Sequence, residues 1–304
     1  MYKIHYLRDK LKILQFMILI ADSGSTKCSW AICNQEGVKL KECNTIGFNP
    51  YFINKETILK ELKNSELEKY KKEITHVFFY GAGCSTKQKN KIIEIPFKEY
   101  FYKADININH DLDAACYAMY NNKPNITCIL GTGSNSCMFD GKNIIENAPS
   151  LGFIMGDEAS GNYFGKKILS LYFNKLLPKE LCEKFEKKYE HNIDNINDNV
   201  YKSSRANVFL ATYFPFVSDN KNHPIIKNLI INTLEDFINV HIKCFENYNN
   251  TEVNFIGSVS YFLQDEIKEL SIKHNFKVGK ILKNPINKLI DYHSKKLMKN
   301  NQVL

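Results

Sequence analysis

The chain has 304 residues, of which 44% are hydrophobic and 24% are charged, as is usual for a globular protein. The formal net charge is +8, but the lysines are scattered among Glu and Asn residues. No basic patch interleaved with aromatic residues occurs, which argues against nucleic-acid binding. The nine cysteines form no CxxC pair and no disulfide-like spacing, so we expect a cytoplasmic protein in a reducing compartment.

The first twenty residues combine basic residues with an apolar run, as secretory signal peptides do. Lysine and arginine residues between positions 3 and 12 precede Ile13–Ala21. The competing interpretation is that residues 18–20 form a strand that ends at Asp22, and cleavage near Ala21 would destroy that strand. We therefore expect residues 1–16 to be an upstream extension rather than an export signal. No other stretch approaches the ~20 apolar residues of a membrane span.

The first half of the chain predicts strands and helices in alternation. Asn54 is a plausible N-cap for a helix with apolar positions at helical spacing. The expected elements are strands Met17–Ala21, Cys28–Cys33 and Val38–Thr45, a helix over Asn54–Lys71, strand His76–Tyr80, a further helix, strand Ala104–Asn109 and helix Asp111–Tyr120.

The second half restarts at Asn125 with the same order of strand, loop and hairpin. The expected elements are strand Ile126–Leu130, helices Gly165–Lys175, Lys179–Tyr189, Arg205–Phe214 and Pro224–Tyr248, strand Glu252–Ile256 with a following helix, and the amphipathic helix Pro285–Lys299. This partial repeat predicts two α/β domains with mixed sheets. We expect them to span residues 17–122 and 123–304, with the last helix packing back on the first domain.

Two loops of small residues follow the first strand of each half. The first is Asp22-Ser23-Gly24-Ser25-Thr26, and the second is Gly131-Thr132-Gly133-Ser134-Asn135. Small residues let the backbone approach an anion, and hydroxyl and N–H groups bind it. Two such hairpins indicate two half-sites for one polyphosphate, although each sequence is also that of an ordinary turn. Asp22 beside a phosphate requires a cation, which predicts Mg²⁺ held partly through water.

Two acids stand where a short strand passes into a helix of small residues. Asp111 or Asp113 could accept a proton from a substrate hydroxyl that attacks phosphorus. The alternative is that they favour the N-terminus of the helix, where acids are common. Residues at i and i+2 of a helix point in different directions, so one can cap while the other faces a ligand.

Further polar and small residues could hold a ligand. Asp157 and Glu158 lie in the small-residue segment that starts at Gly152, and carboxylates accept hydrogen bonds from polyol hydroxyls. An ordinary loop with a helix cap is the alternative there. Other candidates are Asn49 for a ligand hydroxyl, the backbone of Gly81 and Ala82, and Gly257 and Ser258 facing a nucleotide.

Together these segments resemble the family of N-acetylglucosamine kinases and BadF–BadG–BcrA–BcrD ATPases. The resemblance runs from about Met17 to Lys296, and its markers in order are ADSGST, GFNPY, YGAGC, DLDAA, GTGSNS, GFIMGDEASG, FIGSVS and VGKILKNP. It implies two ribonuclease-H-like domains of the actin-like ATPase type around a central nucleotide cleft, with ATP and Mg²⁺ as cofactors.

The resemblance also implies roles for single residues. Asp22–Thr26 and Gly131–Asn135 become the phosphate segments, and Gly257 and Ser258 lie in the adenosine segment. Asn49, Gly152 and Asp157 match positions that hold the sugar. Asp111 becomes the general base, while another alignment would choose Asp113. Where some relatives carry Trp, this chain has Leu151, which bears on the identity of the sugar.

We therefore expect an ATP-dependent kinase acting on the 6-hydroxyl of an amino sugar, most simply N-acetylglucosamine. Its partners would be the sugar and ATP, without nucleic acid or membrane, and a homodimer is left open. The alternative is a BadF-type ATPase that activates a partner enzyme through an iron–sulfur cluster, which requires exposed cysteines. An actin-like filament protein would not explain the Gly-Asp-Glu segment.

Overall fold

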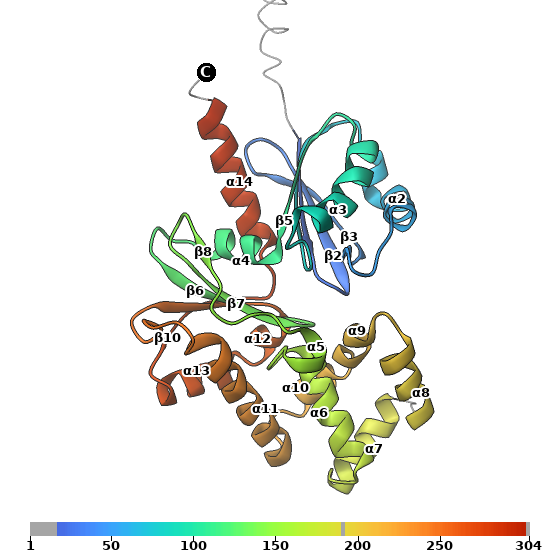
Figure 1. Ribbon diagram of the computed structural model, residues 1–304, viewed down its shortest axis with the longest axis vertical. Helices are drawn as coiled ribbons and strands as arrows, with labels where there is room; N and C mark the ends of the chain where they lie inside the picture. The colour runs from blue at the N-terminus through green and yellow to red at the C-terminus, as the bar shows by residue number, and fades with distance from the viewer. Residues whose placement is uncertain (1–16, 190–191, 302–304) are drawn as a thin grey trace, which may run out of the picture. The chain divides into compact units, whose positions relative to one another are not determined.

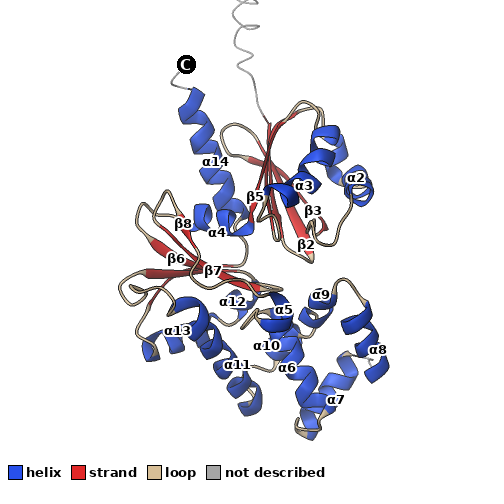
Figure 2. Cartoon of the chain, viewed as in Figure 1, coloured by secondary structure: helices blue, strands red, loops and turns tan. Residues whose placement is uncertain are grey.

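The chain folds into two compact α/β units, each built on one five-stranded sheet (Figures 1 and 2). The computed structural model describes residues 17–189 and 192–301, so the expected extension over residues 1–16 lies outside the described residues. The first unit comprises the described residues up to Asp111 and those from Ile286 onward, and the second comprises Leu112–Pro285. The first unit thus ends before residue 122 and includes the last helix.

The sheet of the first unit has the strand order β3-β2-β1-β4-β5. Its strands are β1 Met17–Ser23, β2 Lys27–Cys33, β3 Lys39–Ile46, β4 Ile74–Gly81 and β5 Asp105–His110. β1, β2 and β3 are antiparallel neighbours, whereas β4 and β5 run parallel to β1. The carboxyl ends of β1, β4 and β5 therefore meet at one edge of the sheet, where ligands of such sheets bind.

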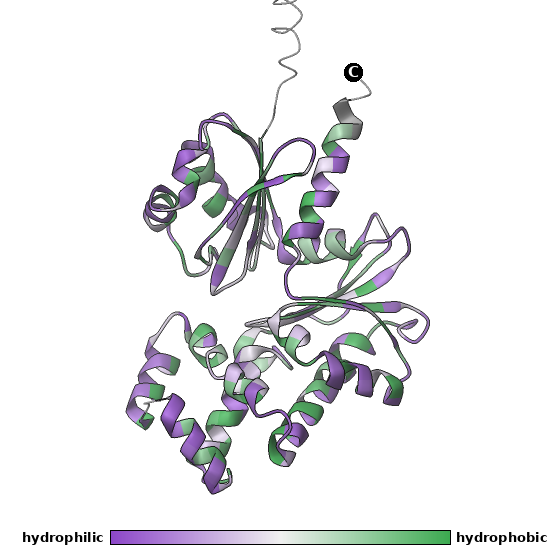
Figure 3. Ribbon diagram, turned by 180° about the vertical axis from the view of Figure 1, so that it is seen from behind, coloured by the Kyte–Doolittle hydropathy of each residue, from purple (hydrophilic) through white to green (hydrophobic). Residues whose placement is uncertain are grey.

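Helices cover both faces of this sheet. They are α2 Lys55–Lys63, the 3₁₀ helix η1 Glu66–Lys69, α3 Lys87–Tyr100 and α14 Ile286–Asn301. α2 and α3 lie on one face and α14 on the other (Figure 1). Under α2 and α3, the rings of Trp30, Phe48, Phe79 and Phe97 form a cluster in which all ring centroids lie 5.2 to 6.5 Å apart. Hydrophilic and apolar residues alternate along α14, as a helix lying on a sheet requires (Figure 3).

The single helix expected over Asn54–Lys71 is wrong, because it is interrupted after Lys63. The Ser65 hydroxyl donates to the Leu62 carbonyl and accepts from the Leu67 N–H, which ends α2 and starts η1. The expected cap is confirmed, since the Asn54 side chain accepts a hydrogen bond from the Thr57 N–H at 2.9 Å.

The sheet of the second unit repeats the plan of the first, with the order β10-β9-β6-β7-β8. Its strands are β6 Asn125–Leu130, β7 Ser134–Phe139, β8 Ile144–Ile145, β9 Glu252–Ile256 and β10 Lys277–Leu282. β6, β7 and β8 form an antiparallel meander, and β9 and β10 run parallel to β6. β6 thus corresponds to β1, and β10, which the sequence did not predict, corresponds to β5.

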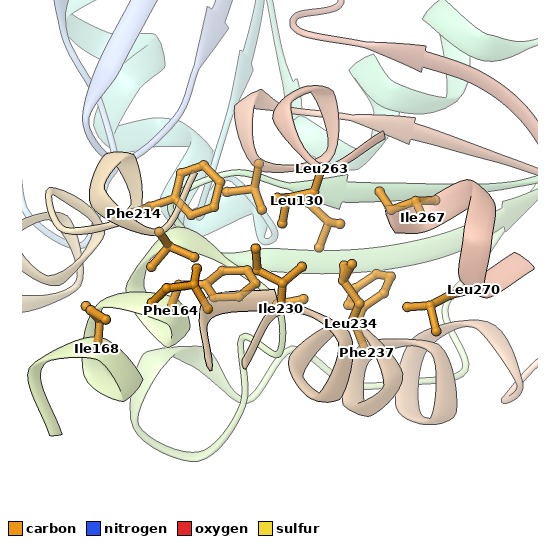
Figure 4. Close-up of a cluster of buried hydrophobic side chains, with 14 of the residues drawn as sticks. Leu130, Phe164, Ile168, Phe214, Ile230, Leu234, Phe237, Leu263, Ile267 and Leu270 are labelled. Atoms are coloured by element: carbon orange, nitrogen blue, oxygen red, sulfur yellow. The ribbon is translucent and has the colours of Figure 1, made fainter. Parts of the chain in front are cut away.

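The second unit carries most of the helices. They are α4 Asp111–Met119, α5 Gly152–Met155, α6 Gly161–Phe173, α7 Lys179–Lys188, α8 Ile193–Asn197, the π-helix η2 Asp198–Lys202, α9 Ala206–Ala211, α10 Phe214–Asp219, α11 Pro224–Phe237, the π-helix η3 Ile238–Ile242, α12 Ser258–Phe262 and α13 Gln264–Lys273. Figure 4 shows apolar side chains of β6, α6, α11 and α13 meeting in the main core of this unit. Residues of α4 pack with β7, β9 and β10 in two smaller clusters.

Three expected helices have different limits. The helix expected over Pro224–Tyr248 ends as α11 at Phe237 and continues as the π-helix η3 only to Ile242. The helix expected from Gly165 begins at Gly161, because the Ser160 hydroxyl caps it by accepting from the Tyr163 N–H. The helix expected over Arg205–Phe214 is two helices, α9 and α10, and Pro215 stands at the start of the second, where proline is tolerated. Among the described residues, no helix is both long and apolar enough to cross a bilayer.

Candidate active site

The loop after β1 is held by two other segments of the first unit. The Gly24 N–H donates to the Lys27 carbonyl at 3.0 Å, which closes the turn. The Ser23 hydroxyl accepts from the Phe48 N–H at 2.8 Å, and the Ser23 carbonyl accepts from the Ala82 N–H at 2.8 Å. Three motifs that are far apart in the sequence therefore meet at the carboxyl end of β1.

Gly47 allows the closest of these approaches. A Cβ atom there would lie 2.1 Å from the Gly24 carbonyl oxygen, so a larger residue would push the loop away. Asn49 lies beside the same loop, where its Nδ2 donates to Ser25 Oγ at 3.3 Å and its Oδ1 accepts from the Tyr51 N–H at 3.0 Å. The amide of Asn49 is therefore fixed in orientation.

Two carboxylates lie close to each other beside this loop. Asp22 is half-buried near the end of β1, and Asp111 follows directly after β5. Burial and the negative charge of Asp111 raise the pKa of Asp22 to about 7, while Lys27 opposes the shift. The Asp111 side chain is 25% exposed, and its Oδ1 lies 3.2 Å from His110 Nε2. Neighbouring carboxylates of this kind fit a divalent cation, since a positive charge would relieve their repulsion.

The loop after β6 is clamped by the N-terminus of α6. The Gly131 N–H donates to the Gly133 carbonyl at 2.9 Å, and the Gly131 carbonyl accepts from the Gly161 N–H at 2.7 Å. Asn162 donates to the Thr132 carbonyl twice, from its backbone N–H at 3.1 Å and from its side chain at 2.7 Å. The loop after β6 is therefore held in a defined shape, as is the loop after β1.

Asp157 belongs to this second loop. Its Oδ1 accepts from the Ser134 N–H at 3.3 Å, and its Oδ2 accepts from Asn162 Nδ2 at 2.6 Å. Burial raises the pKa of Asp157, and both hydrogen bonds oppose that shift because they favour the charged form. The backbone of Asp157 has a φ of +59°, a conformation that costs energy for this residue type and that the hydrogen bonds help to hold.

Gly257 lies against the same loop. It follows β9, has a φ of +127°, and a Cβ atom there would lie 2.1 Å from the Leu130 carbonyl oxygen. Its N–H donates to the Leu282 carbonyl at 2.9 Å. Gly257 and Ser258 therefore lie at the carboxyl ends of β9 and β6, where the adenosine segment is expected.

The structure divides the expected sugar-binding residues between the two units. Asn49, Gly81 and Ala82 lie in the first unit, next to the loop after β1. Gly152, Asp157 and Glu158 lie in the second unit. Gly152 opens α5 with a φ of +69°, and a Cβ atom added there would meet no other atom within 4 Å. It is followed by the exposed side chains of Ile154 and Met155.

Sequence reasoning missed two residues of the second unit. Asn162 stands just after the Gly-Asp-Glu segment, and its position near that motif was the available signal. His241 Nε2 lies 3.1 Å from Glu158 Oε2, although 83 positions separate the two residues. No spacing rule joins such residues, so only the fold could reveal this contact.

All nine cysteines are free. Cys43, Cys182 and Cys244 are half-buried, and the other six are buried. The exposed cysteines that an iron–sulfur activator requires are thus not found. Across residues 17–189 and 192–301, no group of three or more His, Cys, Asp or Glu residues is arranged to hold a metal ion. A magnesium ion held by Asp22 and water would not need such a group.

The repeated sheets and their loops define a protein of the actin-like ATPase fold. The chain is similar to the crystal structure of a "putative N-acetylglucosamine kinase" from Porphyromonas gingivalis, with a TM-score of 0.86 and 32% identity over 91% of this chain and 99% of that chain. The protein therefore belongs to the N-acetylglucosamine kinase-like family of the actin-like ATPase superfamily, which confirms the resemblance and the fold class.

More distant structures share the fold alone. A protein from Chromobacterium violaceum with the same description has a TM-score of 0.61 and 15% identity, over 91% of this chain and 99% of that chain. A ROK-family glucokinase from Streptomyces griseus, in complex with glucose and AMPPNP, has a TM-score of 0.52 and 12% identity, over 91% and 97%. No family model and no curated protein matches the sequence. The roles of individual residues stay predictions.

Proposed function

We propose that the protein is an ATP-dependent kinase that phosphorylates the 6-hydroxyl of an amino sugar, with N-acetylglucosamine as the first candidate. The observation that carries this proposal is the carboxylate pair, because Asp111 reaches solvent beside an acid suited to a cation. The relative from Porphyromonas gingivalis, described as such a kinase, supports the same reaction.

Two loops bind phosphate in this proposal. Backbone N–H and hydroxyl groups of Asp22–Thr26 and of Gly131–Ser134 bind phosphate oxygens, and Gly257 and Ser258 face the adenosine. Asp22 would hold Mg²⁺ through water, and the bound ion supplies neutralisation of phosphate charge. The fixed shape of both loops means that little ordering is needed when the nucleotide binds.

Asp111 is the proposed general base. Its carboxylate accepts the proton of the sugar hydroxyl while that oxygen bonds to the γ-phosphorus and the bond to the ADP oxygen breaks. His110, 3.2 Å away, restricts the orientation of the carboxylate. Most of the rate enhancement then comes from positioning and from charge neutralisation.

The proposed contacts of the acceptor sugar are the expected sugar-binding residues. Asn49 offers an amide already oriented by Ser25 and Tyr51, and the N–H groups near Gly81 and Ala82 lie beside it. Gly152, Asp157 and Glu158 supply the remaining contacts. Since Leu151 stands where some relatives carry Trp, the substrate panel should include glucosamine and N-acetylmuramic acid. The free thiols of all nine cysteines suit a cytoplasmic enzyme.

The test is an ADP-release assay over that panel, with two matched variants. Asp111→Asn should lower kcat by about 1,000-fold or more and leave ATP affinity within about twofold, since only the proton acceptor is lost. Asp113→Asn, two positions away on the same helix, should stay within about threefold of the wild type.

Two outcomes would contradict the proposal. If Asp113→Asn is the inactive variant, the general base is Asp113. If the wild type releases no sugar-dependent ADP with any member of the panel, the kinase assignment is wrong.

A further inference from the structure

A buried histidine joins Glu158 to the strand after the second loop. His241 lies on the π-helix η3 and is 2% exposed. Its Nε2 lies 3.1 Å from Glu158 Oε2, and its Nδ1 lies 3.4 Å from Ser136 Oγ on β7. The Phe237 ring stacks on the imidazole at 4.8 Å between centroids. The ring is therefore held at both nitrogens and on one face.

The partners of His241 define one tautomer. Burial lowers the pKa of His241, although Glu158 and Asp157 oppose the shift, so the ring is neutral at neutral pH. A neutral imidazole has one N–H donor and one acceptor nitrogen. Because the Glu158 carboxylate can only accept, Nε2 carries the hydrogen, and Nδ1 accepts from the Ser136 hydroxyl. All hydrogen bonds then run in one direction, from Ser136 through His241 to Glu158.

The second carboxylate oxygen of Glu158, Oε1, is not bound by His241. Among the described residues, Oε1 has no hydrogen-bond partner, and the side chain is 18% exposed. Two side chains of α6 lie close enough to influence Glu158 electrostatically, but both donate elsewhere: Tyr163 to Asp236, and Lys166 to the Phe153 carbonyl. One carboxylate oxygen is thus fixed by the protein, while the second can accept from a ligand.

A serine, a histidine and a glutamate in line also occur in hydrolases, but that chemistry does not fit here. Ser136 has no exposed surface, so no ester or amide could reach its hydroxyl. The arrangement instead resembles a metal site or binding site in which an outer group orients a ligand-binding side chain. Of the three residues, only Glu158 is exposed enough to contact a ligand, so a function of this arrangement must involve Glu158.

We propose that His241 is a positioning residue that holds Glu158 so that its Oε1 accepts a hydrogen bond from a hydroxyl group of the acceptor sugar. This inference rests on the proposed kinase function and deepens it. A carboxylate that is already oriented loses less rotational freedom when a sugar binds, and therefore binds it more tightly. Because the contact is made equally before and during phosphoryl transfer, its loss should raise the KM for sugar and leave kcat nearly unchanged.

The test compares two substitutions that preserve different halves of the imidazole. His241→Gln places an amide N–H near the position of Nε2 and keeps the donor to Glu158. His241→Asn reaches only the position of Nδ1 and loses that donor. We expect His241→Asn to raise the KM for sugar about tenfold, with kcat and the KM for ATP within about twofold, and His241→Gln to stay within about threefold of the wild type.

A double-mutant cycle links the effect to Glu158. Glu158→Gln should raise the KM for sugar at least as much as His241→Asn, and combining the two should add little, since both remove the same oriented carboxylate. Nitrogen-15 NMR of the histidine rings should show the neutral Nε2–H tautomer for His241 at pH 7, a readout that does not depend on turnover.

The inference would be overturned by an unchanged sugar KM in His241→Asn, by an equal rise in the KM for ATP, or by an Nδ1–H tautomer. A purely structural role would lower Tm in the Asn variant without the selective rise in sugar KM. These results differ from failure of the proposed function, in which the wild type itself phosphorylates no sugar.

Discussion

The hairpins β1–β2 and β6–β7, which carry the two proposed phosphate-binding loops, share one topology. They differ in which part of the chain supplies the carboxylate beside the loop. In the hairpin β1–β2, the acid is part of the loop sequence itself, as Asp22. In the hairpin β6–β7, Gly131 takes the corresponding place, and the carboxylate of Asp157 is brought in from the turn before α6 by bonds to Ser134 and Asn162. The repeated fold therefore preserved the loop and its position, while the source of negative charge changed.

The two carboxylates also differ in how strongly the protein holds them. Asp22 has no hydrogen-bond partner among the described residues, and burial together with the nearby negative charge of Asp111 raises its pKa. Asp157 accepts two hydrogen bonds and keeps its loop in shape. An acid without an internal hydrogen bond is suited to bind a ligand ion, whereas an acid with two internal partners also keeps its own loop in shape.

Exchanging each acid for its amide should separate these two roles. Asp22→Asn should lower kcat by about 1,000-fold, because the cation loses its ligand, with an unchanged or higher free energy of unfolding. Asp157→Asn should lower the free energy of unfolding by about 1 to 2 kcal/mol, because its new NH₂ group faces N–H donors. Activity assays and urea unfolding of both variants measure the difference. A less stable Asp22→Asn protein would remove the distinction.

The close backbone approaches in the two units can be compared through glycines. Gly47→Ala should cost about 3 kcal/mol of unfolding free energy, because its Cβ would lie 2.1 Å from the Gly24 carbonyl oxygen. Gly24→Ala is the control, since its nearest atom lies at 3.8 Å. Thermal unfolding measures both.

In the second unit, Gly257→Ala should cost a similar amount, since it adds a clash at 2.1 Å to a φ of +127°. Gly152→Ala has a φ of +69° in open space and should cost only about 1 kcal/mol. Equal losses for Gly257→Ala and Gly152→Ala would mean that backbone conformation, and not the close approach, decides the effect.

The acid stability of the first unit should depend on His293. The His293 ring, on α14, stacks on Phe78, and its Nε2 lies 2.6 Å from the Tyr80 hydroxyl oxygen. Burial lowers the pKa of His293 from 6.5 to about 3. Below about pH 6.5 the unfolded chain takes up a proton that the folded chain refuses until about pH 3. Stability should therefore fall as the pH decreases through this window, by about 2 kcal/mol between pH 7 and pH 5.

Urea unfolding across that pH range tests this expectation, with His293→Phe as the variant that cannot titrate. His241 in the second unit acts in the same direction, so the difference between wild type and variant isolates His293. A variant whose pH dependence matches that of the wild type would show that folding does not lower the pKa of His293.

Strands bounded by small-residue loops were predictable from the sequence, as β1, β4, β6 and β9 show, because their apolar runs and turns are local. β10 was not, since Lys277–Leu282 mixes lysine, glycine and apolar residues without alternation. It becomes a strand through long-range pairing, including Leu282 with Ile256, and through the Lys280 N–H, which donates to Asn254 Oδ1 at 2.7 Å. The end of α2 at Lys63 depends on the Ser65 hydroxyl, and the spacing of apolar residues gives no sign of such a hydrogen bond.

In the candidate site, too, some features could be predicted from the sequence and others could not. The two phosphate-type loops could be recognised because each is contiguous and lies at the end of a strand. The proximity of Asp22 to Asp111 and of Glu158 to His241 could not, because it arises where separate strands and helices converge. The sequence could suggest which acids matter, but only the fold could tell which of them is unpaired.

The position of α14 has a consequence for synthesis on the ribosome. The second unit is a continuous insertion between two segments of the first, and its residues are synthesised before those of α14. The first unit is completed only afterwards, when α14 covers the face that carries Phe78 and Tyr80. During that interval an apolar sheet face stays uncovered, and the oldest part of the nascent chain would be the part most in need of a chaperone.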